Sequence, residues 1–293
     1  METYGYYPGC SLHSTGIEYD QSFRAVCSQL DIALTEIPGW ICCGTSPTHS
    51  TSKLLSLALP IKNLSLAEAA GYKEIAVPCA ACFSRFKIAL HETEQDPKLT
   101  QEVYEVIDSH FRRTVKVLHP LEIFSKIDPK LLKAKVTKNL SELKVVCYYG
   151  CLLTRPPKAM QFDNAENPIT MDRILEAVGI STLDWSYKTD CCGGIFALSE
   201  TDAVLTLTNK ILENAKAVGA NAIAVACPLC HSNLDGRQIE IEAKYETQYG
   251  IPILYFTQLI GLALGTEAKQ LGLFKHLVST ESLLESQAEA AVK

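Results

Sequence analysis

At 293 residues, with 47% hydrophobic and 20% charged residues, the chain has the composition of a folded globular protein rather than a disordered one. Its length is sufficient for two domains of ordinary size. The net charge of −6 and the lack of a basic run argue against a nucleic-acid-binding protein. Lysines within residues 126–146 alternate with Leu, Val and Glu, which is typical of a solvated helix face.

Neither a secretory signal nor a membrane span is expected. The first residues contain no basic segment followed by an apolar run. The longest apolar stretch, Ile253 to Leu264, is interrupted by Thr257, Gln258 and Gly261 and is too short to span a bilayer. We therefore expect a soluble cytoplasmic protein, in which twelve cysteines suggest ligands or redox groups rather than structural disulfides.

Short apolar runs of strand length alternate with helical patterns along the chain. In order, we expect a strand at 4–7, a helix at 52–70, a strand at 75–77, a connector at 126–143, a strand at 145–149, a helix at 202–218, a strand at 223–225 and a small polar tail at 277–293. Continuous apolar strands are typical of buried parallel sheets. The pattern predicts an α/β fold with small, mostly parallel sheets and flanking helices.

Ten of the twelve cysteines repeat one pattern, a single cysteine followed by Cys-Cys-Gly and then by Cys-x-x-Cys. The first copy is Cys10, Cys42, Cys43, Cys79 and Cys82, and the second is Cys151, Cys191, Cys192, Cys227 and Cys230. The flanks repeat as well, since residues 74–79 parallel 222–227 and residues 115–121 resemble 251–257. We therefore predict two duplicated domains, at residues 1–135 and 136–293, related by a pseudo-two-fold axis.

The cysteines follow the predicted strands, in the region where ligand sites gather in parallel sheets. Adjacent residues in a strand point to opposite faces, so a Cys-Cys pair reaches one centre only from a turn, which Gly44 and Gly193 permit. A structural zinc takes four ligands, whereas each half offers five, and an iron–sulfur cluster can use the extra thiolate. Zinc in at least one half, and dithiol chemistry without a metal, are the alternatives.

This spacing resembles the CCG domain, and two such domains in one chain resemble the B-type subunit of heterodisulfide reductase over roughly residues 4 to 265. In that family each domain holds a non-cubane 4Fe–4S cluster through its five cysteines. The resemblance therefore implies two such clusters, one on the first set of five cysteines and one on the second. The family reduces the mixed disulfide of coenzyme M and coenzyme B to two thiols. Its clusters are thought to face each other across the substrate, so that homolytic cleavage gives each cluster one sulfur.

The same resemblance implies an oxidoreductase that works within a multisubunit complex. The chain has no flavin motif and no ferredoxin-type cysteine run, so its electrons must come from partners. The family's partners are a ferredoxin-like C-type subunit with ordinary 4Fe–4S clusters and a large, flavin-containing A-type subunit, often joined to a hydrogenase or a formate dehydrogenase. The expected substrate is a small-molecule disulfide.

Two other functions compete with disulfide reduction. CCG domains also occur in subunits of succinate, fumarate, glycolate and lactate oxidoreductases, where the chain would relay electrons to a quinone or dock a complex to a membrane. Residues 271–284 would then form an interfacial helix. A zinc-stabilised scaffold without redox activity is the remaining alternative.

Three histidines lie near the motif cysteines in sequence, namely His13, His49 and His231. A histidine titrates near physiological pH and could protonate a product thiolate. His231, which directly follows Cys230, is the best placed and is our candidate catalytic proton donor. A hydrogen-bonding role in the core or at the surface is the alternative for each.

Other residues near the motif carry weaker expectations. Cys27 is expected to be a buried small hydrophobic residue, and Cys147 to belong to a strand rather than to a metal site. Arg155 and Lys188 are candidates to bind acidic groups of a substrate, with an exposed cation as the alternative. Packing around the clusters is expected of four tyrosines, Tyr6, Tyr7, Tyr148 and Tyr149.

Overall fold

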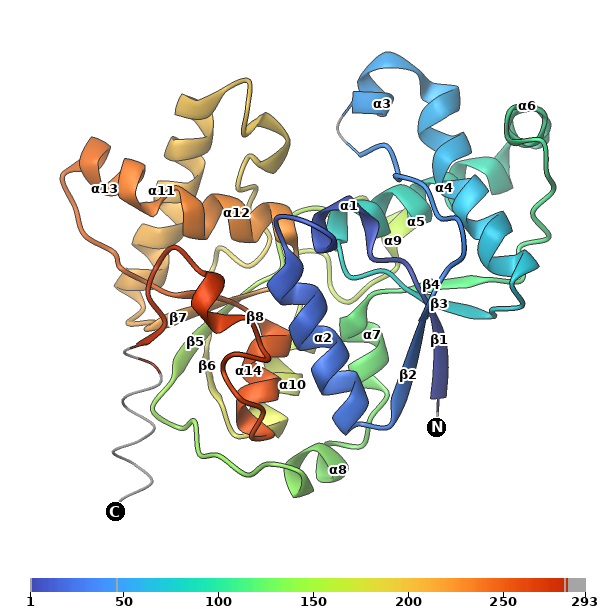
Figure 1. The fold of residues 1–293 in the computed structure, drawn as a ribbon. Helices are drawn as coiled ribbons and strands as arrows, with labels where there is room; N and C mark the ends of the chain where they lie inside the picture. Colours follow the sequence, from blue (N-terminus) through green and yellow to red (C-terminus); the bar gives the residue numbers. More distant parts are fainter. Residues whose placement is uncertain (1, 46, 282, 284–293) are drawn as a thin grey trace.

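Two four-stranded sheets form the centre of the computed structural model, which describes residues 2–45, 47–281 and 283 (Figure 1). The strand order is β2-β1-β3-β4 in the first sheet and β6-β5-β7-β8 in the second, so the two halves share one topology. All pairings in these sheets are parallel. The strands are β1 Glu2–Tyr6, β2 Ile32–Glu36, β3 Glu74–Ala76, β4 Lys116–Leu118, β5 Lys144–Tyr148, β6 Ser181–Leu183, β7 Ala222–Val225 and β8 Ile253–Tyr255.

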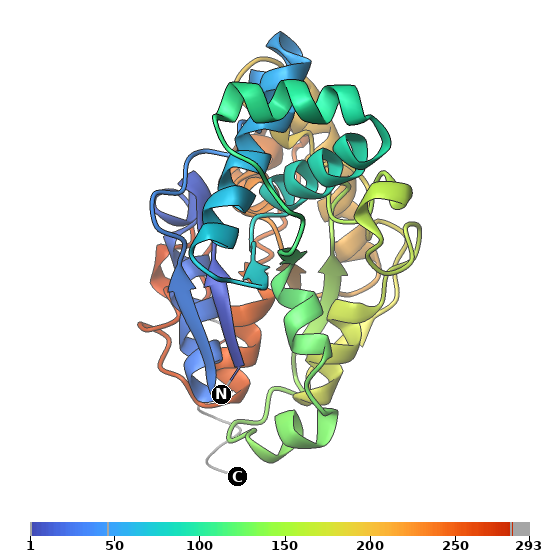
Figure 2. The same cartoon turned by 90° about the vertical axis from the view of Figure 1, so that its right-hand side faces the viewer.

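Helices connect the strands and cover the sheets. In the first half they are α1 Gly9–Leu12, α2 Ile17–Gln29, α3 Pro47–Thr51, α4 Lys53–Ala69, α5 Ala80–Gln95, α6 Pro97–Ile107, α7 Pro120–Ser125 and α8 Pro129–Ala134. In the second half they are α9 Pro157–Met160, α10 Thr170–Ala177, η1 Gly194–Phe196, α11 Thr201–Ala217, α12 Pro228–Gly236, α13 Gln238–Tyr245, α14 Phe256–Ala263 and η2 Leu273–Lys275. Figure 2 shows the sheets side by side, with both sets of strands running toward the end where α3, α6 and α11 lie.

The predicted α/β fold with two duplicated units is confirmed. The strands expected at 4–7, 75–77, 145–149 and 223–225 are β1, β3, β5 and β7, and the helices expected at 52–70 and 202–218 are α4 and α11. Ser52 begins α4 as its N-cap by accepting a hydrogen bond from Leu55 N. The sequence pattern did not predict β2, β4, β6 and β8: β2 is only partly buried, and the other three have three residues each.

The two halves are interlocked rather than joined end to end. Helix α2 of the first half packs on α14 of the second, and α10 of the second half packs on α7 of the first. Between α2 and α14, Ser22 Oγ lies 2.6 Å from Thr257 Oγ1. Tyr19 in α2 stacks on Tyr255 with 4.3 Å between ring centroids, a contact that contributes about 1 kcal/mol beyond its burial. The boundary at residues 135 and 136 stays a prediction, but these reciprocal contacts tie the two halves into one body.

The expectation of one interfacial helix over residues 271–284 is wrong, because residues 271–280 do not form it. From 271 to 280 the helical residues are Leu273–Lys275, a single 3₁₀ turn, and Leu271 and Leu273 are buried in the core. Most of the polar tail at 277–293, including 282 and 284–293, lies outside the described residues. Across residues 2–45, 47–281 and 283, no helix combines the length and apolar character needed to cross a membrane.

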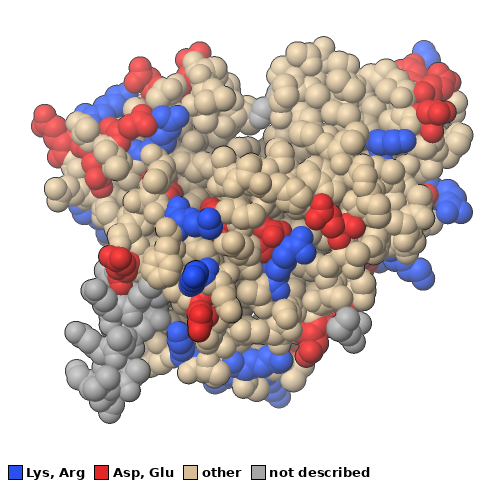
Figure 3. Space-filling view, in the orientation of Figure 1, with Lys and Arg blue, Asp and Glu red and all other residues tan. Residues whose placement is uncertain are grey.

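Charged side chains are distributed unevenly over the face shown in Figure 3. Lys, Arg, Asp and Glu gather over α11 and α13 and across the lower half, with both signs interspersed. The area over α3 is uncharged, and the sequence of α3, Pro47–Thr51, contains none of these residues. This face therefore has no basic patch of the kind that nucleic acid requires.

Candidate metal centres

The five cysteines of the first repeat converge at the carboxyl ends of three adjacent strands. Cys10 lies in α1 after β1, Cys42 and Cys43 lie in the loop after β2, and Cys79 and Cys82 begin α5 after β3. Cys43 Sγ is 3.0 Å from Cys82 Sγ, although the two residues are far apart in sequence. Cys10 and Cys42 are exposed and the other three are buried, so the set is open to solvent on one side.

The second repeat reproduces this arrangement after β5, β6 and β7. Cys192 Sγ lies 3.7 Å from Cys230 Sγ, and Cys227 is the N-cap residue of α12 as Cys79 is of α5. All five cysteines of this half line a single cavity, together with Ala80, Tyr149, Leu152, Gly194, Ile195 and Leu229. The sequence grouped each set of five correctly, and the assignment of all ten as metal ligands stays a prediction.

The Cys-Cys pair occupies a turn in both halves. Gly44 and Gly193 have φ values of +75° and +73°, which side chains other than that of glycine rarely adopt. Their N–H groups point at the first sulfur of each pair, with Gly44 N 3.5 Å from Cys42 Sγ and Gly193 N 3.3 Å from Cys191 Sγ. A backbone N–H directed at sulfur stabilises the thiolate, which is the state that binds metal.

In each half, a buried tyrosine donates a hydrogen bond to the loop that carries the Cys-Cys pair. Tyr7 donates a hydrogen bond of 2.8 Å to the Ile41 carbonyl, and Tyr148 donates one of 2.6 Å to the Asp190 carbonyl. These carbonyls belong to the residues directly before Cys42 and Cys191. The sequence predicted that these tyrosines pack around the site, but it missed their hydrogen bonds to the two loops.

Close packing of the sulfurs shifts their proton affinities in opposite directions. Hydrogen bonds from Cys42 and Cys82 lower the pKa of Cys43 to about 3, and the hydrogen bond from Cys151 lowers that of Cys191 to about 6. The pKa of Cys82 is raised well above its usual value by the hydrogen bond to Cys43. Thiols this close share protons when no metal is bound, and a cation is required before all of them can ionise.

Each half offers five thiols, one more than a single structural zinc ion takes. Within the described ranges, only His231, Asp235 and His276 bring three potential ligand atoms within 4.8 Å of one another, and no three cysteine sulfurs do so. Close approach of the chain to the sulfurs also requires glycine, since a Cβ on Gly150 would lie 2.9 Å from Cys230 Sγ. A set of five thiols in each half is a donor set that fits an iron–sulfur group.

The two sets of cysteines meet across the boundary between the halves. Cys79 and Cys227 are fully buried, and each thiol perturbs the other. The pKa of Cys79 is raised, chiefly by its hydrogen bond to Cys227, whereas that of Cys227 is lowered by Cys230 and by Cys79. Groups bound by the two sets would therefore be neighbours.

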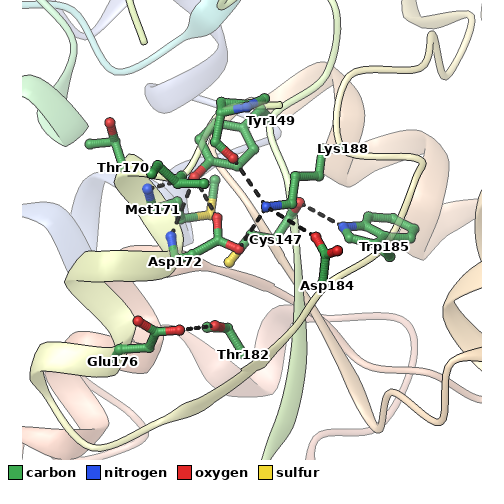
Figure 4. Close-up of polar contacts among 12 residues, drawn as sticks. Cys147, Tyr149, Thr170, Met171, Asp172, Glu176, Thr182, Asp184, Trp185 and Lys188 are labelled. Atoms are coloured by element: carbon green, nitrogen blue, oxygen red, sulfur yellow. Dashed lines mark hydrogen bonds and ion pairs between the residues drawn. The ribbon is translucent and has the colours of Figure 1, made fainter. Parts of the chain in front are cut away.

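A buried ion pair braces the second set (Figure 4). Lys188 Nζ lies 3.0 Å from Asp172 Oδ1 and 3.1 Å from the Pro168 carbonyl. Tyr149 donates a 2.6 Å hydrogen bond to Asp172 Oδ2, and Tyr149 N and Gly150 N donate to the Lys188 carbonyl. The network thus joins the segment before Cys191 to the segment before Cys151.

This network corrects the expectation that Lys188 binds an acidic substrate, because its side chain is only 4% exposed and is already paired. Arg155 is engaged as well, with Glu166 at 2.6 Å and with the Thr189 carbonyl at 3.2 Å. Cys147 is fully buried within β5, where burial raises its pKa, and Cys27 is buried in α2. Both are buried as expected, and neither lines the cavity of the second set.

The histidines near the motif lie apart from that cavity. His231 is stacked on Tyr255, and its Nε2 is 2.9 Å from His276 Nδ1. Burial lowers the pKa of His231 to about 3. His13 is half-exposed beside Glu36, and His49 lies on the exposed helix α3. The proton-donor role of His231 stays a prediction.

Comparison with known proteins agrees with this duplicated site. The model of the family described as "Cysteine-rich domain" (CCG) matches residues 4–87 and 145–235, which is more than half of the chain. The chain belongs to the CCG family. Each matched segment contains one full set of five cysteines. The duplicated CCG unit predicted from the sequence is therefore confirmed.

Relatives of full length fall into two functional groups. The chain is 30% identical over 97% of its length to the 8-methylmenaquinol:fumarate reductase membrane anchor subunit of Wolinella succinogenes, of which it covers 99%. It is also 30% identical over 94% of its length to the B-type subunit of the ferredoxin:CoB-CoM heterodisulfide reductase of Methanosarcina mazei, of which it covers 94%.

Among solved structures, a hypothetical protein from Helicobacter pylori has a TM-score of 0.77 at 12% identity. The match covers 95% of this chain and 52% of that one, and it supports the fold alone.

Proposed function

We propose that this CCG protein is the catalytic iron–sulfur subunit of a heterodisulfide reductase-like complex. Its reaction is the reduction of a mixed disulfide of the coenzyme M–coenzyme B type, in which two electrons and two protons convert one disulfide to two thiols. The cofactors are two non-cubane 4Fe–4S clusters. One is held by Cys10, Cys42, Cys43, Cys79 and Cys82, and the other by Cys151, Cys191, Cys192, Cys227 and Cys230.

The observation that carries this proposal is that the two sets of five cysteines adjoin. Ala80, directly after Cys79, lines the same cavity as the second set, and Cys79 and Cys227 shift each other's pKa. A disulfide needs two electrons, and two neighbouring one-electron centres can deliver one each. Clusters held by these cysteines would supply the two electrons one at a time and a Lewis acid for the developing thiolates. Both sets are also open on the side of Cys10, Cys42 and Cys191, which leaves a route for a substrate.

Residues of the chain position the cysteine ligands and supply a proton. The turns at Gly44 and Gly193 direct backbone N–H groups at sulfur, which favours thiolate ligands. Tyr7 and Tyr148 hold the two Cys-Cys loops at a constant distance from their sheets. We assign proton donation to His231, whose contact with His276 connects it to a second ring. A proton donor acts in its protonated form, so a His231→Gln variant should lose the alkaline limb of the pH–rate profile and keep its iron.

Electrons reach this protein from partners. We propose a ferredoxin-like C-type subunit and a flavin-containing A-type subunit as these partners, in the cytoplasm, with a hydrogenase or formate dehydrogenase module as the primary donor. The Methanosarcina mazei relative carries the name of a ferredoxin:CoB-CoM heterodisulfide reductase, which supports an iron–sulfur protein as the electron donor.

The first test is iron and acid-labile sulfide per chain after strictly anaerobic purification. About eight of each supports two four-iron clusters. About four leaves one half empty and contradicts cleavage between two clusters, and zinc without sulfide overturns the redox function. A chain with eight irons is then assayed for thiol formation from the mixed disulfide with a reduced low-potential donor.

A second function, electron exchange with a quinone in a fumarate or succinate oxidoreductase, is favoured by the lining of the cavity. No Lys, Arg or His is among the residues that line it, and Lys188 and Arg155 are engaged in ion pairs. An anionic disulfide requires cations, whereas an uncharged quinone head group does not. The Wolinella relative, named as part of a menaquinol:fumarate reductase, agrees with this second function.

Substrate oxidation and reduction separate the two functions. The purified complex, with its iron quantified, is mixed in turn with the mixed disulfide plus a reduced low-potential donor and with a soluble menaquinol analogue. Thiol release without quinol oxidation supports the reductase. Quinol-dependent reduction of the iron–sulfur absorption bands, without thiol release, supports the quinone function.

A further inference from the structure

His119 lies between the two cysteine sets, although it is not part of the repeated motif. It follows β4 and is the N-cap residue of α7, with no exposed surface. Its ring Nδ1 accepts a hydrogen bond from Leu121 N at 3.2 Å. The backbone N–H of His119 donates to Glu122 Oε2 at 2.7 Å. Together these bonds form a capping box. They also assign the tautomer, because a ring nitrogen that accepts a hydrogen bond carries no proton.

The proton of the neutral ring is therefore on Nε2. Burial lowers the pKa of His119 to about 4, so the ring is neutral at physiological pH. Nε2 lies 2.9 Å from the Pro78 carbonyl oxygen and 3.2 Å from that of Ala226. One N–H group thus donates to two acceptors, one in each half of the protein.

The two carbonyls belong to the residues directly before Cys79 and Cys227. Each cysteine is the N-cap residue of its helix, α5 or α12. The Cys79 carbonyl accepts the first hydrogen bond of its helix from Phe83 N at 2.8 Å, and the Cys227 carbonyl accepts the first of its helix from His231 N at 2.9 Å. A displacement of either carbonyl held by His119 would therefore move a cysteine and the first turn of its helix together.

Only one of the two halves supplies this bridge. The position equivalent to His119 in the second half is Tyr255, which forms the capping box of α14 with Gln258. Its ring is stacked between Tyr19 and His231, with centroid separations of 4.3 and 4.5 Å. The hydrogen bonds of His119 to both halves thus break the pseudo-two-fold relationship.

We propose that His119 is a positioning residue that sets the separation of Cys79 and Cys227, and with it the interaction between the two bound clusters. The part that concerns clusters rests on the proposed function, whereas the coupling of the two helix starts does not. The hydrogen bonds at Nε2 perform this role, and those at Nδ1 serve only the start of α7.

A His119→Asn variant separates these two roles. Asparagine is a good N-cap residue, so it retains the cap of α7, but its side chain is too short to reach both carbonyls. In hydrogen–deuterium exchange, we expect the amides at the starts of α5 and α12 to exchange about tenfold faster together, as for the loss of one buried hydrogen bond. The start of α7 should exchange as in the unmodified chain. A His119→Phe variant, which loses the cap as well, should affect all three segments.

The iron-loaded variant gives a second readout. With iron and sulfide unchanged, the electron paramagnetic resonance spectrum of the reduced His119→Asn chain should show a changed magnetic interaction between its two centres. Normal exchange at both helix starts in His119→Asn, or faster exchange in only one half, overturns the proposal. A chain that binds no iron refutes the proposed function, but the exchange experiment still decides the role of His119.

Discussion

Replacement of Gly150 by alanine tests whether the second cysteine set holds a cluster. Gly150 has a φ of +68°, and a Cβ at this position would lie 2.9 Å from Cys230 Sγ. The left-handed backbone costs alanine about 1–2 kcal/mol. Ordinary contact requires about 3.5–4.0 Å, so the sulfur has to move by about 0.6–1.1 Å. Ligand distances in a metal site tolerate only about 0.2 Å. We therefore expect the variant to fold and to lose the second cluster.

The assay combines iron and sulfide analysis with urea unfolding under anaerobic conditions. Gly150→Ala should retain about four of about eight irons per chain. The matched control is Gly219→Ala, which has a similar φ of +80° but no atom within 4 Å of the added Cβ. The control should lose about 1–2 kcal/mol of stability through backbone strain and keep all of its iron. Full iron in Gly150→Ala would refute the reasoning, and iron loss in both variants would assign the effect to strain alone.

Three further predictions concern the supports of the site. Tyr148→Phe should cost about 1 kcal/mol of unfolding free energy in urea and shift the reduction potential of one cluster, because it removes the hydrogen bond that holds the Cys-Cys loop; an unchanged potential would contradict a positioning role. Lys188→Met should cost about 3 kcal/mol or more, because Asp172 is left buried and unpaired. Lys244→Met, which breaks an exposed pair, should leave the unfolding free energy nearly unchanged in the same assay, and equal losses in the two variants would argue against the buried pair. The unfolding free energy of the metal-free chain should fall as the pH is lowered from about 6.5 to 4. Folding lowers the pKa of His119 to about 4, so over this range the unfolded chain binds a proton on His119 that the folded chain does not. His119 alone accounts for up to about 3 kcal/mol of this decline, and His119→Asn should show a shallower slope in unfolding experiments over that range.

The grouping of the cysteines could be read from the sequence because it depends on local features. Each set follows the carboxyl ends of strands, and parallel strands bring these ends together whatever the rest of the chain does. Gly44 and Gly193 likewise predict the turns at the Cys-Cys pairs, since a positive φ is a property of the residue and its neighbours. The α/β class followed from the alternation of strand and helix patterns, and the duplication followed from the repeated cysteine spacing.

What only the tertiary structure decided concerns contacts between segments far apart in sequence. His119 bridges Pro78 and Ala226, and no local pattern predicts that one ring nitrogen reaches both. Lys188 has the charge expected of a substrate-binding residue, yet its side chain is buried in an ion pair with Asp172 of α10. Periodicity reports which face of an element is buried, but the partner of a buried polar group depends on how distant elements pack.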